Sequence, residues 1–276
     1  MITIEPPGGN FEAESAKRRL EELKEEYAKL LAEYDELTGP VRCNLESEYM
    51  MRIGRLEYRL FSLQVRAQQL KREIALYQAA ENRRETISPD EVAGIIEREF
   101  AAYRAALAEQ REKLRKAEEQ YFAPKLSVDD TRALRTLYHD MVRKLHPDIN
   151  RDLPEEAKRL WVRIVEAYKT GDWQELNILA DMVYDLLEDG RPAAGSPEGM
   201  ARLFEEERRI AGKIAAIRER IDRLRKQPPY SWLTLLEDNE AVNARRRELR
   251  EQRTRFEEYI AELTVLRDKL CGGENG

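Results

Sequence analysis

Apolar residues recur along much of the chain at alternating steps of three and four residues, which keeps one apolar stripe on one side of a helix. Thr38-Gly39-Pro40 separates the first two such stretches, residues 11–37 and 41–80. Glycine commonly ends a helix and proline readily opens the next one. Because this turn is short, we expect an antiparallel coiled-coil hairpin over residues 11–87. The two stripes are Leu20, Leu23, Tyr27, Leu30, Tyr34 and Leu37, then Leu56, Leu60, Leu63, Ala67, Leu70, Ile74 and Tyr77.

A third helix is marked by its first residues. Ser88-Pro89-Asp90-Glu91 combines an N-cap serine, a proline at the first helical position and a glutamate that completes a capping box. The helix is predicted to run to residue 121, and Pro124 ends it. We therefore expect a long connecting helix over residues 88–125.

The C-terminal part repeats the pattern of the N-terminal part. Residues 189–197 are rich in glycine and proline and are interpreted as a linker. Residues 198–271 are expected to form a second coiled-coil hairpin, which turns at Gln227-Pro228-Pro229-Tyr230. Heptads specify a seam but not its partner, so such hairpins can close within one chain or between two; the short turns favour one chain. The stripes are Ile210, Ile214, Ile217, Ile221 and Leu224, then Leu235, Val242, Leu249, Phe256, Leu263 and Leu270.

No strand-like alternation of useful length interrupts these patterns, which predicts an all-α fold. Charged residues make up 37% of the chain and apolar residues 42%, a balance typical of long helices that bury a narrow seam. The fold class expected is therefore all-α, with long antiparallel helical hairpins flanking a small helical module over residues 126–188.

The charge and cysteine content narrow the function classes. The net charge of −6 argues against nucleic-acid binding. The run Arg245-Arg246-Arg247 is the feature that supports the alternative of a nucleic-acid-associated helical protein. Cys43 and Cys271 form no Cys-x-x-Cys pair, and no secretion signal is visible at the N-terminus, which favours a cytoplasmic setting. No stretch is apolar over the 18 residues that a membrane span requires. We expect neither a metal nor another cofactor, and no catalysis by the chain itself.

The segment of residues 134–168 carries the functional signal. Leu134, Leu137, Met141 and Leu145 share one face of a helix, and cationic residues share another. His146-Pro147-Asp148-Ile149-Asn150 breaks this helix, and a second amphipathic helix follows from residue 154. Two helices of this size joined by a short loop should pack antiparallel and expose the loop at their tip. The second helix carries its stripe at Ala157, Trp161, Ile164 and Tyr168.

Residues 131–169 resemble the J-domain family of co-chaperones. The pattern Tyr138-x-x-Met141-x-x-Lys144-x-His146-Pro147-Asp148-x-Asn150 is similar to that family's second helix and loop. The pattern Ala157-x-x-x-Trp161-x-x-Ile164-x-Glu166-Ala167-Tyr168 is similar to its third helix, with Trp161 where phenylalanine is usual. A lone His-Pro-Asp tripeptide is weak, but both flanking patterns are in register with it.

The resemblance implies a partner, a DnaK-type chaperone ATPase, whose ATP hydrolysis the chain would stimulate. The loop residues carried over are His146, Pro147 and Asp148. The cations of the implied docking face are Arg135, Arg143 and Lys144, with Arg132 and His139 beside them. Exposed cations steer an acidic partner surface, proline stiffens the loop, and a carboxylate accepts charge-assisted hydrogen bonds from a partner's arginine. The coiled-coil arms are expected to bind a client or an adaptor protein.

Some features of the family are missing. No Tyr-x-x-Leu-Gly first-helix pattern, no Gly/Phe-rich segment and no cysteine-rich zinc module is present. The end of the helix at residues 88–121, or Tyr121-Phe122, is expected to supply the contacts of the missing first helix. These departures sustain a second hypothesis, a coiled-coil scaffold or adaptor in which the J-like module is degenerate.

Overall fold

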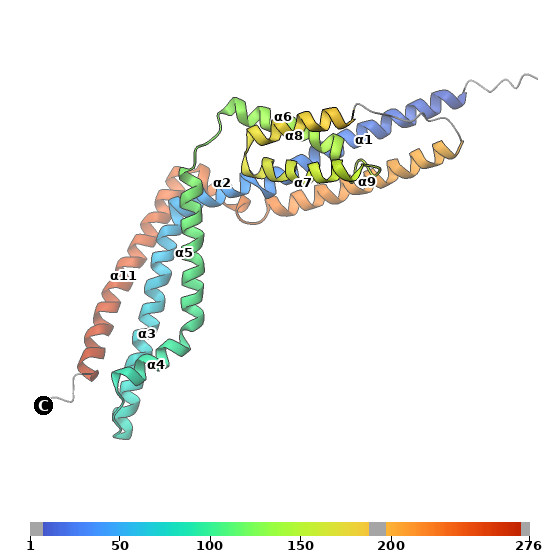
Figure 1. Cartoon of the computed structure of the whole chain (residues 1–276). Coiled ribbons are helices and arrows are strands. Elements are labelled where there is room, and N and C mark those ends of the chain that lie inside the picture. The colour runs from blue at the N-terminus through green and yellow to red at the C-terminus, as the bar shows by residue number, and fades with distance from the viewer. Residues whose placement is uncertain (1–7, 188–196, 272–276) are drawn as a thin grey trace, which may run out of the picture. The chain divides into compact units, whose positions relative to one another are not determined.

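The computed structural model describes residues 8–187 and 197–271, and within them every regular element is a helix (Figure 1). The expected all-α fold class is confirmed. The chain divides into two compact units, each assembled from segments far apart in the sequence. Unit 1 comprises Met1–Arg42 and Pro124–Ser231, and unit 2 comprises Cys43–Ala123 and Trp232–Gly276.

In unit 1 a pair of long helices supports a layer of three shorter ones. The pair is α1 and α9, and the ion pairs Glu26–Arg218 and Glu33–Arg225 join them. Because the residue numbers rise together along both helices, the two run parallel. The three shorter helices pack on this pair and on one another. The bounds in this unit are α1 (Gly8–Thr38), α6 (Val128–Leu145), α7 (Glu155–Thr170), α8 (Trp173–Leu187) and α9 (Pro197–Arg225).

Unit 2 repeats the parallel pairing with α3 and α11. The ion pairs Glu57–Arg245 (3.1 Å) and Glu73–Arg267 (3.3 Å) join them. Their seam uses the predicted stripes, including Leu60, Leu70, Ile74, Val242, Leu249 and Leu263. The bounds are η1 (a π-helical turn, Met50–Gly54), α3 (Arg55–Arg83), α4 (Pro89–Glu99), α5 (Ala101–Phe122), α10 (Leu233–Glu237) and α11 (Asn239–Cys271). Two short elements contain residues of both units, α2 (Pro40–Tyr49) and η2 (Tyr230–Trp232).

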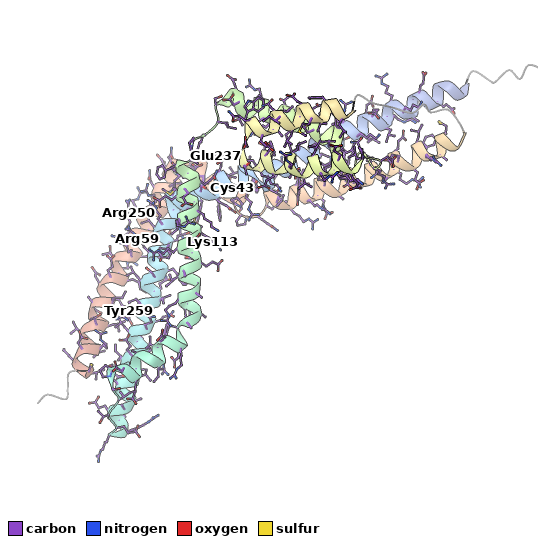
Figure 2. The ribbon with its side chains drawn as sticks, viewed as in Figure 1. Cys43, Arg59, Lys113, Glu237, Arg250 and Tyr259 are labelled. Atoms are coloured by element: carbon purple, nitrogen blue, oxygen red, sulfur yellow. The ribbon has the colours of Figure 1, made fainter. Side chains whose placement is uncertain are left out.

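An antiparallel arm is present in unit 2, where α4 and α5 return along α3. Arg72 pairs with Glu99 at 2.8 Å and Arg55 with Glu118 at 2.5 Å, so the numbers fall along α3 as they rise along α4 and α5. The Ser88–Glu91 capping box forms as predicted, with the Glu91 amide 3.2 Å from Ser88 Oγ. Figure 2 shows exposed charged side chains on all three long helices of this unit: Arg59 on α3, Lys113 on α5 and Arg250 on α11.

The helical arms therefore exist, but the partners of the long helices differ from those that the turns suggested. We expected residues 11–87 and 198–271 each to fold back on themselves, whereas α1 pairs with α9 and α3 pairs with α11. The physical reason is that Gly39 is the single non-helical residue between α1 and α2. Pro40 opens a new helix directly after it, and each heptad stripe then pairs with a stripe about 190 residues away.

Other boundaries are close to those predicted. The helix expected over residues 88–121 is divided at Phe100, whose φ of −101° and ψ of 12° lie outside the α-helical region. The linker expected at 189–197 lies almost wholly outside the described residues, and so does the tail after Cys271. Among the helices that are described, none is both long enough and apolar enough to cross a membrane.

Candidate partner-binding site

The site begins with α6, whose ends are determined by its sequence. Ser127 caps the first turn, with its hydroxyl accepting the Asp130 amide at 3.0 Å. The helix ends at Leu145 because His146 precedes a proline, which disfavours helical backbone; His146 has an extended ψ of 125°. Arg143 and Lys144 lie in the last turn, where cations interact favourably with the helix dipole.

Beneath the site, α6 and α7 pack through aromatic rings. Tyr138 is fully buried and stacks on Tyr168, with ring centroids 3.8 Å apart. One end of the interface pairs Tyr138 with Tyr168, and the other pairs His146 with Trp161 at 5.3 Å. The numbers rise in α6 while they fall in α7, so the two helices are antiparallel. The loop of residues 146–150 consequently lies at their tip, as predicted.

The loop is ordered by its own backbone. The amides of Ile149 and Asn150 both donate to the His146 carbonyl at 2.9 Å. The Asn150 side chain donates to the Arg143 carbonyl at 2.8 Å, which satisfies a carbonyl in the last turn of α6. Ile149 is buried in the core of unit 1 and anchors the loop from below. Pro147 is exposed at the tip.

His146 is held as a neutral imidazole. Its pKa is lowered to about 4, chiefly by burial; the Asp148 carboxylate raises the pKa and the Lys213 ammonium lowers it, both by less than burial. Its Nδ1 accepts the Asp148 amide at 3.1 Å, which requires an unprotonated nitrogen there. The edges of Tyr27 and Trp161 flank the ring. His146 therefore shapes the loop and does not act as a cation at neutral pH.

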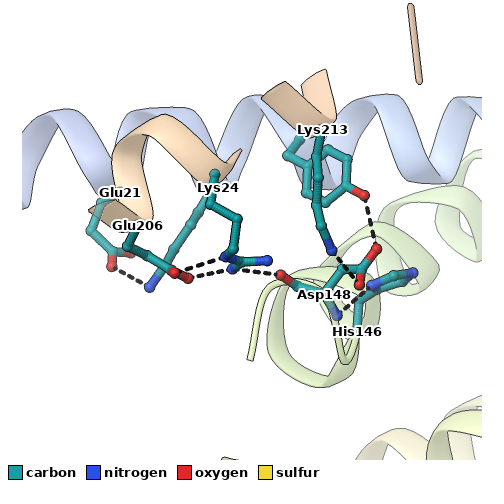
Figure 3. Close-up of polar contacts among 8 residues, drawn as sticks. Glu21, Lys24, His146, Asp148, Glu206 and Lys213 are labelled. Carbon is teal, nitrogen blue, oxygen red and sulfur yellow. Dashed lines mark hydrogen bonds and ion pairs between the residues drawn. The ribbon is translucent and has the colours of Figure 1, made fainter. Parts of the chain in front are cut away.

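Asp148 is bound by groups from α1 and α9, as Figure 3 shows. Tyr27 OH donates to its carboxylate at 3.0 Å, and Lys213 Nζ forms an ion pair with the other carboxylate oxygen. Arg209 Nη2 donates to its backbone carbonyl at 2.9 Å. Burial raises the pKa of Asp148, but the bonds from Lys213 and Tyr27 outweigh burial and hold the pKa below its usual value. The carboxylate is thus ionised and already partnered.

The predicted cations do not form one free face. Arg135 pairs with Glu36, and Arg143 Nε lies 3.5 Å from Glu25 Oε2; both carboxylates belong to α1. Lys144 turns the other way. It pairs with Asp140 at 2.9 Å and lies over the Tyr184 ring of α8 at 3.9 Å.

The two flanking candidates, Arg132 and His139, also have different partners, one within α6 and one on α1. Arg132 is exposed and pairs within its own helix with Asp129. His139 Nε2 lies 3.7 Å from the α1 carboxylate of Glu25. The structure thus gathers His146, Pro147, Asp148, Arg143 and Lys144 at one end of α6, and it places Arg135 farther back along α6, beside Glu36 of α1.

Sequence reasoning missed Tyr27, Arg209 and Lys213, which bind Asp148. Tyr27 was assigned only to a heptad stripe, and nothing in the local sequence distinguishes Arg209 or Lys213 from other cations on α9. Tyr121 and Phe122, which were expected to supply the contacts of the missing first helix, have exposed side chains, Phe122 at 68%. Residues of α1 cover α6 instead.

Comparison with known proteins gives no neighbour: no family model, no curated protein and no solved structure matches the chain.

Proposed function

We propose that this chain is a cytoplasmic co-chaperone that docks on a DnaK-type chaperone ATPase and stimulates its ATP hydrolysis. One observation carries the proposal: His146-Pro147-Asp148 forms an ordered loop at the tip of an antiparallel helix pair, directly after two cations in the last turn of α6. The flanking residue patterns that resemble a J domain add to this geometry.

The chain's contribution to such a reaction is a docking surface. Arg143 and Lys144 would steer an acidic surface of the chaperone towards the loop. Pro147, exposed at the tip, would pack against the partner, and Asp148 would accept a charge-assisted hydrogen bond from a partner's guanidinium. ATP hydrolysis itself belongs to the chaperone. The helices of unit 2 would remain available for a client or adaptor protein.

Single-turnover ATP hydrolysis by a DnaK-type chaperone, with and without the full chain, tests this function. We expect stimulation by the native chain and its loss with His146→Gln, because the loop geometry depends on the His146 Nδ1 acceptor. Arg163→Gln is a matched control on α7, since Arg163 pairs with Glu175 away from the loop. Stimulation by His146→Gln equal to that by the native chain would exclude the function.

A second candidate is a coiled-coil scaffold or adaptor in which the J-like module only stabilises unit 1. The observation that favours it is the use of Asp148 in contacts to α1 and α9. It predicts stable assembly with another protein, measured by size-exclusion chromatography with light scattering, that is indifferent to Asp148→Asn. Loss of that assembly in Asp148→Asn would exclude it.

A further inference from the structure

The polar groups needed for the proposed docking are already bound within the chain. The Asp148 carboxylate forms an ion pair with the Lys213 ammonium of α9 and accepts a hydrogen bond from the Tyr27 hydroxyl of α1 (Figure 3). The Asp148 backbone carbonyl accepts a hydrogen bond from Arg209. On α6, the α1 carboxylates Glu36 and Glu25 take the place that an acidic partner surface would take beside Arg135 and Arg143. Groups of unit 1 itself therefore already form the hydrogen bonds and ion pairs that a docking partner would form with the loop and with α6.

The helices that provide these groups are fixed in place. The Tyr27 ring is 4% exposed, and Ile210 and Ile214, which flank Lys213 on α9, are buried in the same core. Moving α1 or α9 away would expose that core to water. A partner therefore has to meet the loop with both helices in position.

The charged side chains that α9 brings to the loop, unlike the backbone of the helix, are reached by water. The Lys213 side chain is 31% exposed and that of Asp148 is 44% exposed. Ion pairs that water reaches contribute little net free energy, equivalent to about a fivefold change in an equilibrium constant at most. The ammonium can leave Asp148 by a rotation of its flexible stem, while the backbone of α9 stays where it is.

We propose that Lys213, assisted by Tyr27, is an exchangeable latch on Asp148 that a partner's guanidinium must displace. The inference rests on the proposed function and describes the regulation of that same site. A planar guanidinium offers a carboxylate two parallel hydrogen bonds, whereas an ammonium acts as a point charge, so arginine is the cation suited to win this exchange. Glu25 and Glu36 impose the same requirement on the other side, because an acidic partner surface must replace them.

The latch therefore makes docking selective and weaker than it would be with a free loop. A partner that presents only an acidic surface satisfies the α6 cations but leaves Asp148 with Lys213. A partner that presents an arginine inside an acidic surface exchanges both sets of pairs. Removing the ammonium without disturbing the core should strengthen docking of such a partner by about threefold, the size of one exposed ion pair.

The test uses the full chain with Lys213→Met, which keeps an unbranched apolar stem, and Lys213→Met combined with Tyr27→Phe, which keeps the buried ring. Arg225→Met is the matched control, because it removes another α9–α1 ion pair, to Glu33, far from the loop. The half-saturating concentration for chaperone ATPase stimulation is measured for each variant. We expect a decrease of about threefold for Lys213→Met, a larger one for the double variant, and none for Arg225→Met.

A double-mutant cycle between Lys213→Met and Asp148→Asn, read from urea unfolding, detects the latch without any partner. If the effects of the two single substitutions on the unfolding constant simply multiply in the double variant, there is no coupling. That result would overturn the latch and leave the proposed function untouched. So would an unchanged or increased half-saturating concentration in Lys213→Met, which would make Lys213 part of the docking surface. Clear coupling combined with no stimulation by any variant would instead overturn the proposed function, and the regulatory role of the latch with it.

Discussion

The two units of this chain share one scaffold and differ in what they place on it. Each contains a parallel pair of long helices, α1 with α9 and α3 with α11, whose bonded partners lie 188 to 194 residues apart. In unit 1 the third layer is the module of α6, α7 and α8. In unit 2 it is the return arm of α4 and α5.

The depth of burial distinguishes these third layers. In unit 1, Tyr138, Met141, Ile164 and Leu176 are fully buried in one continuous core with the long pair. In unit 2, the 22-residue α5 has Ala117 as its single buried residue. Helical pattern alone does not distinguish these situations, because an exposed arm and a buried module both show stripes. The difference teaches that the third layer of unit 1 is part of its core, whereas α5 in unit 2 lies largely at the surface.

The largest expected contrast is between buried truncations in the two third layers. Ile164→Ala should lower the free energy of unfolding of unit 1 by about 3 kcal/mol, through lost burial and a cavity. Leu114→Ala, at a half-exposed position of α5, should cost about 1 kcal/mol. Native-state hydrogen exchange, resolved by helix, measures both. Equal costs at the two positions would contradict the difference between the layers.

Acid should weaken unit 1 through a group that unit 2 lacks. Both histidines of the chain, His139 and His146, lie in unit 1. Burial lowers the pKa of His146 to about 4, below its ordinary value of 6.5, so protonation favours the unfolded chain. The stabilisation is present above pH 6.5 and is lost as the pH falls towards 4. Between pH 7 and 4.5 the loss is about 2 kcal/mol.

Urea unfolding of the native chain and of His146→Gln across this pH range isolates the effect. Asp35 acts in the opposite direction, because burial raises its pKa, and its contribution is common to both proteins. The native chain should lose stability more steeply than the variant. Parallel curves for the two proteins would show that His146 is not held neutral by the fold.

The smallest expected contrast concerns the two serine caps. Ser127→Ala and Ser88→Ala each remove a hydroxyl that accepts a first-turn amide, of α6 and α4 respectively, at a cost of about 1 kcal/mol. In unit 1 the loss should reach the amides of α6 and α7 together, because they share one core. In unit 2 it should be confined to α4. Faster amide exchange that extends over the same number of helices in both variants would contradict this difference between the units.

Much of the fold could be predicted from local signals. The all-α class, the caps at Ser88 and Ser127 and the breaks at Pro124 and Pro147 follow from side-chain chemistry that acts over a few residues. The partners of the long helices could not be predicted, because a heptad stripe is complementary to any other stripe. The turn at Gly39-Pro40 illustrates this: it is a helix break of the kind found in hairpins, yet α1 pairs with α9 and α3 pairs with α11.

The same limit applies to the candidate site. The order of the loop at residues 146–150 follows from its sequence, since Pro147 ends α6 and Asn150 can reach back to Arg143. The occupation of Asp148 does not follow, because Tyr27 and Lys213 come from segments 121 residues before it and 65 residues after it in the chain. Local reasoning therefore identified the loop and missed what binds it.

The parallel pairing of distant segments gives the chain an order of assembly during synthesis. Glu26 of α1 is made 192 residues before its partner on α9, an interval of about 10 to 40 s at ordinary translation rates. In the last part of that interval, after Thr170 and before Lys213 is added, α6, α7 and their loop are complete while Lys213 does not yet exist. The nascent chain therefore presents an unlatched Asp148 and an uncovered apolar stripe on α1 at the ribosome, a transient form that the finished protein replaces when α9 is added.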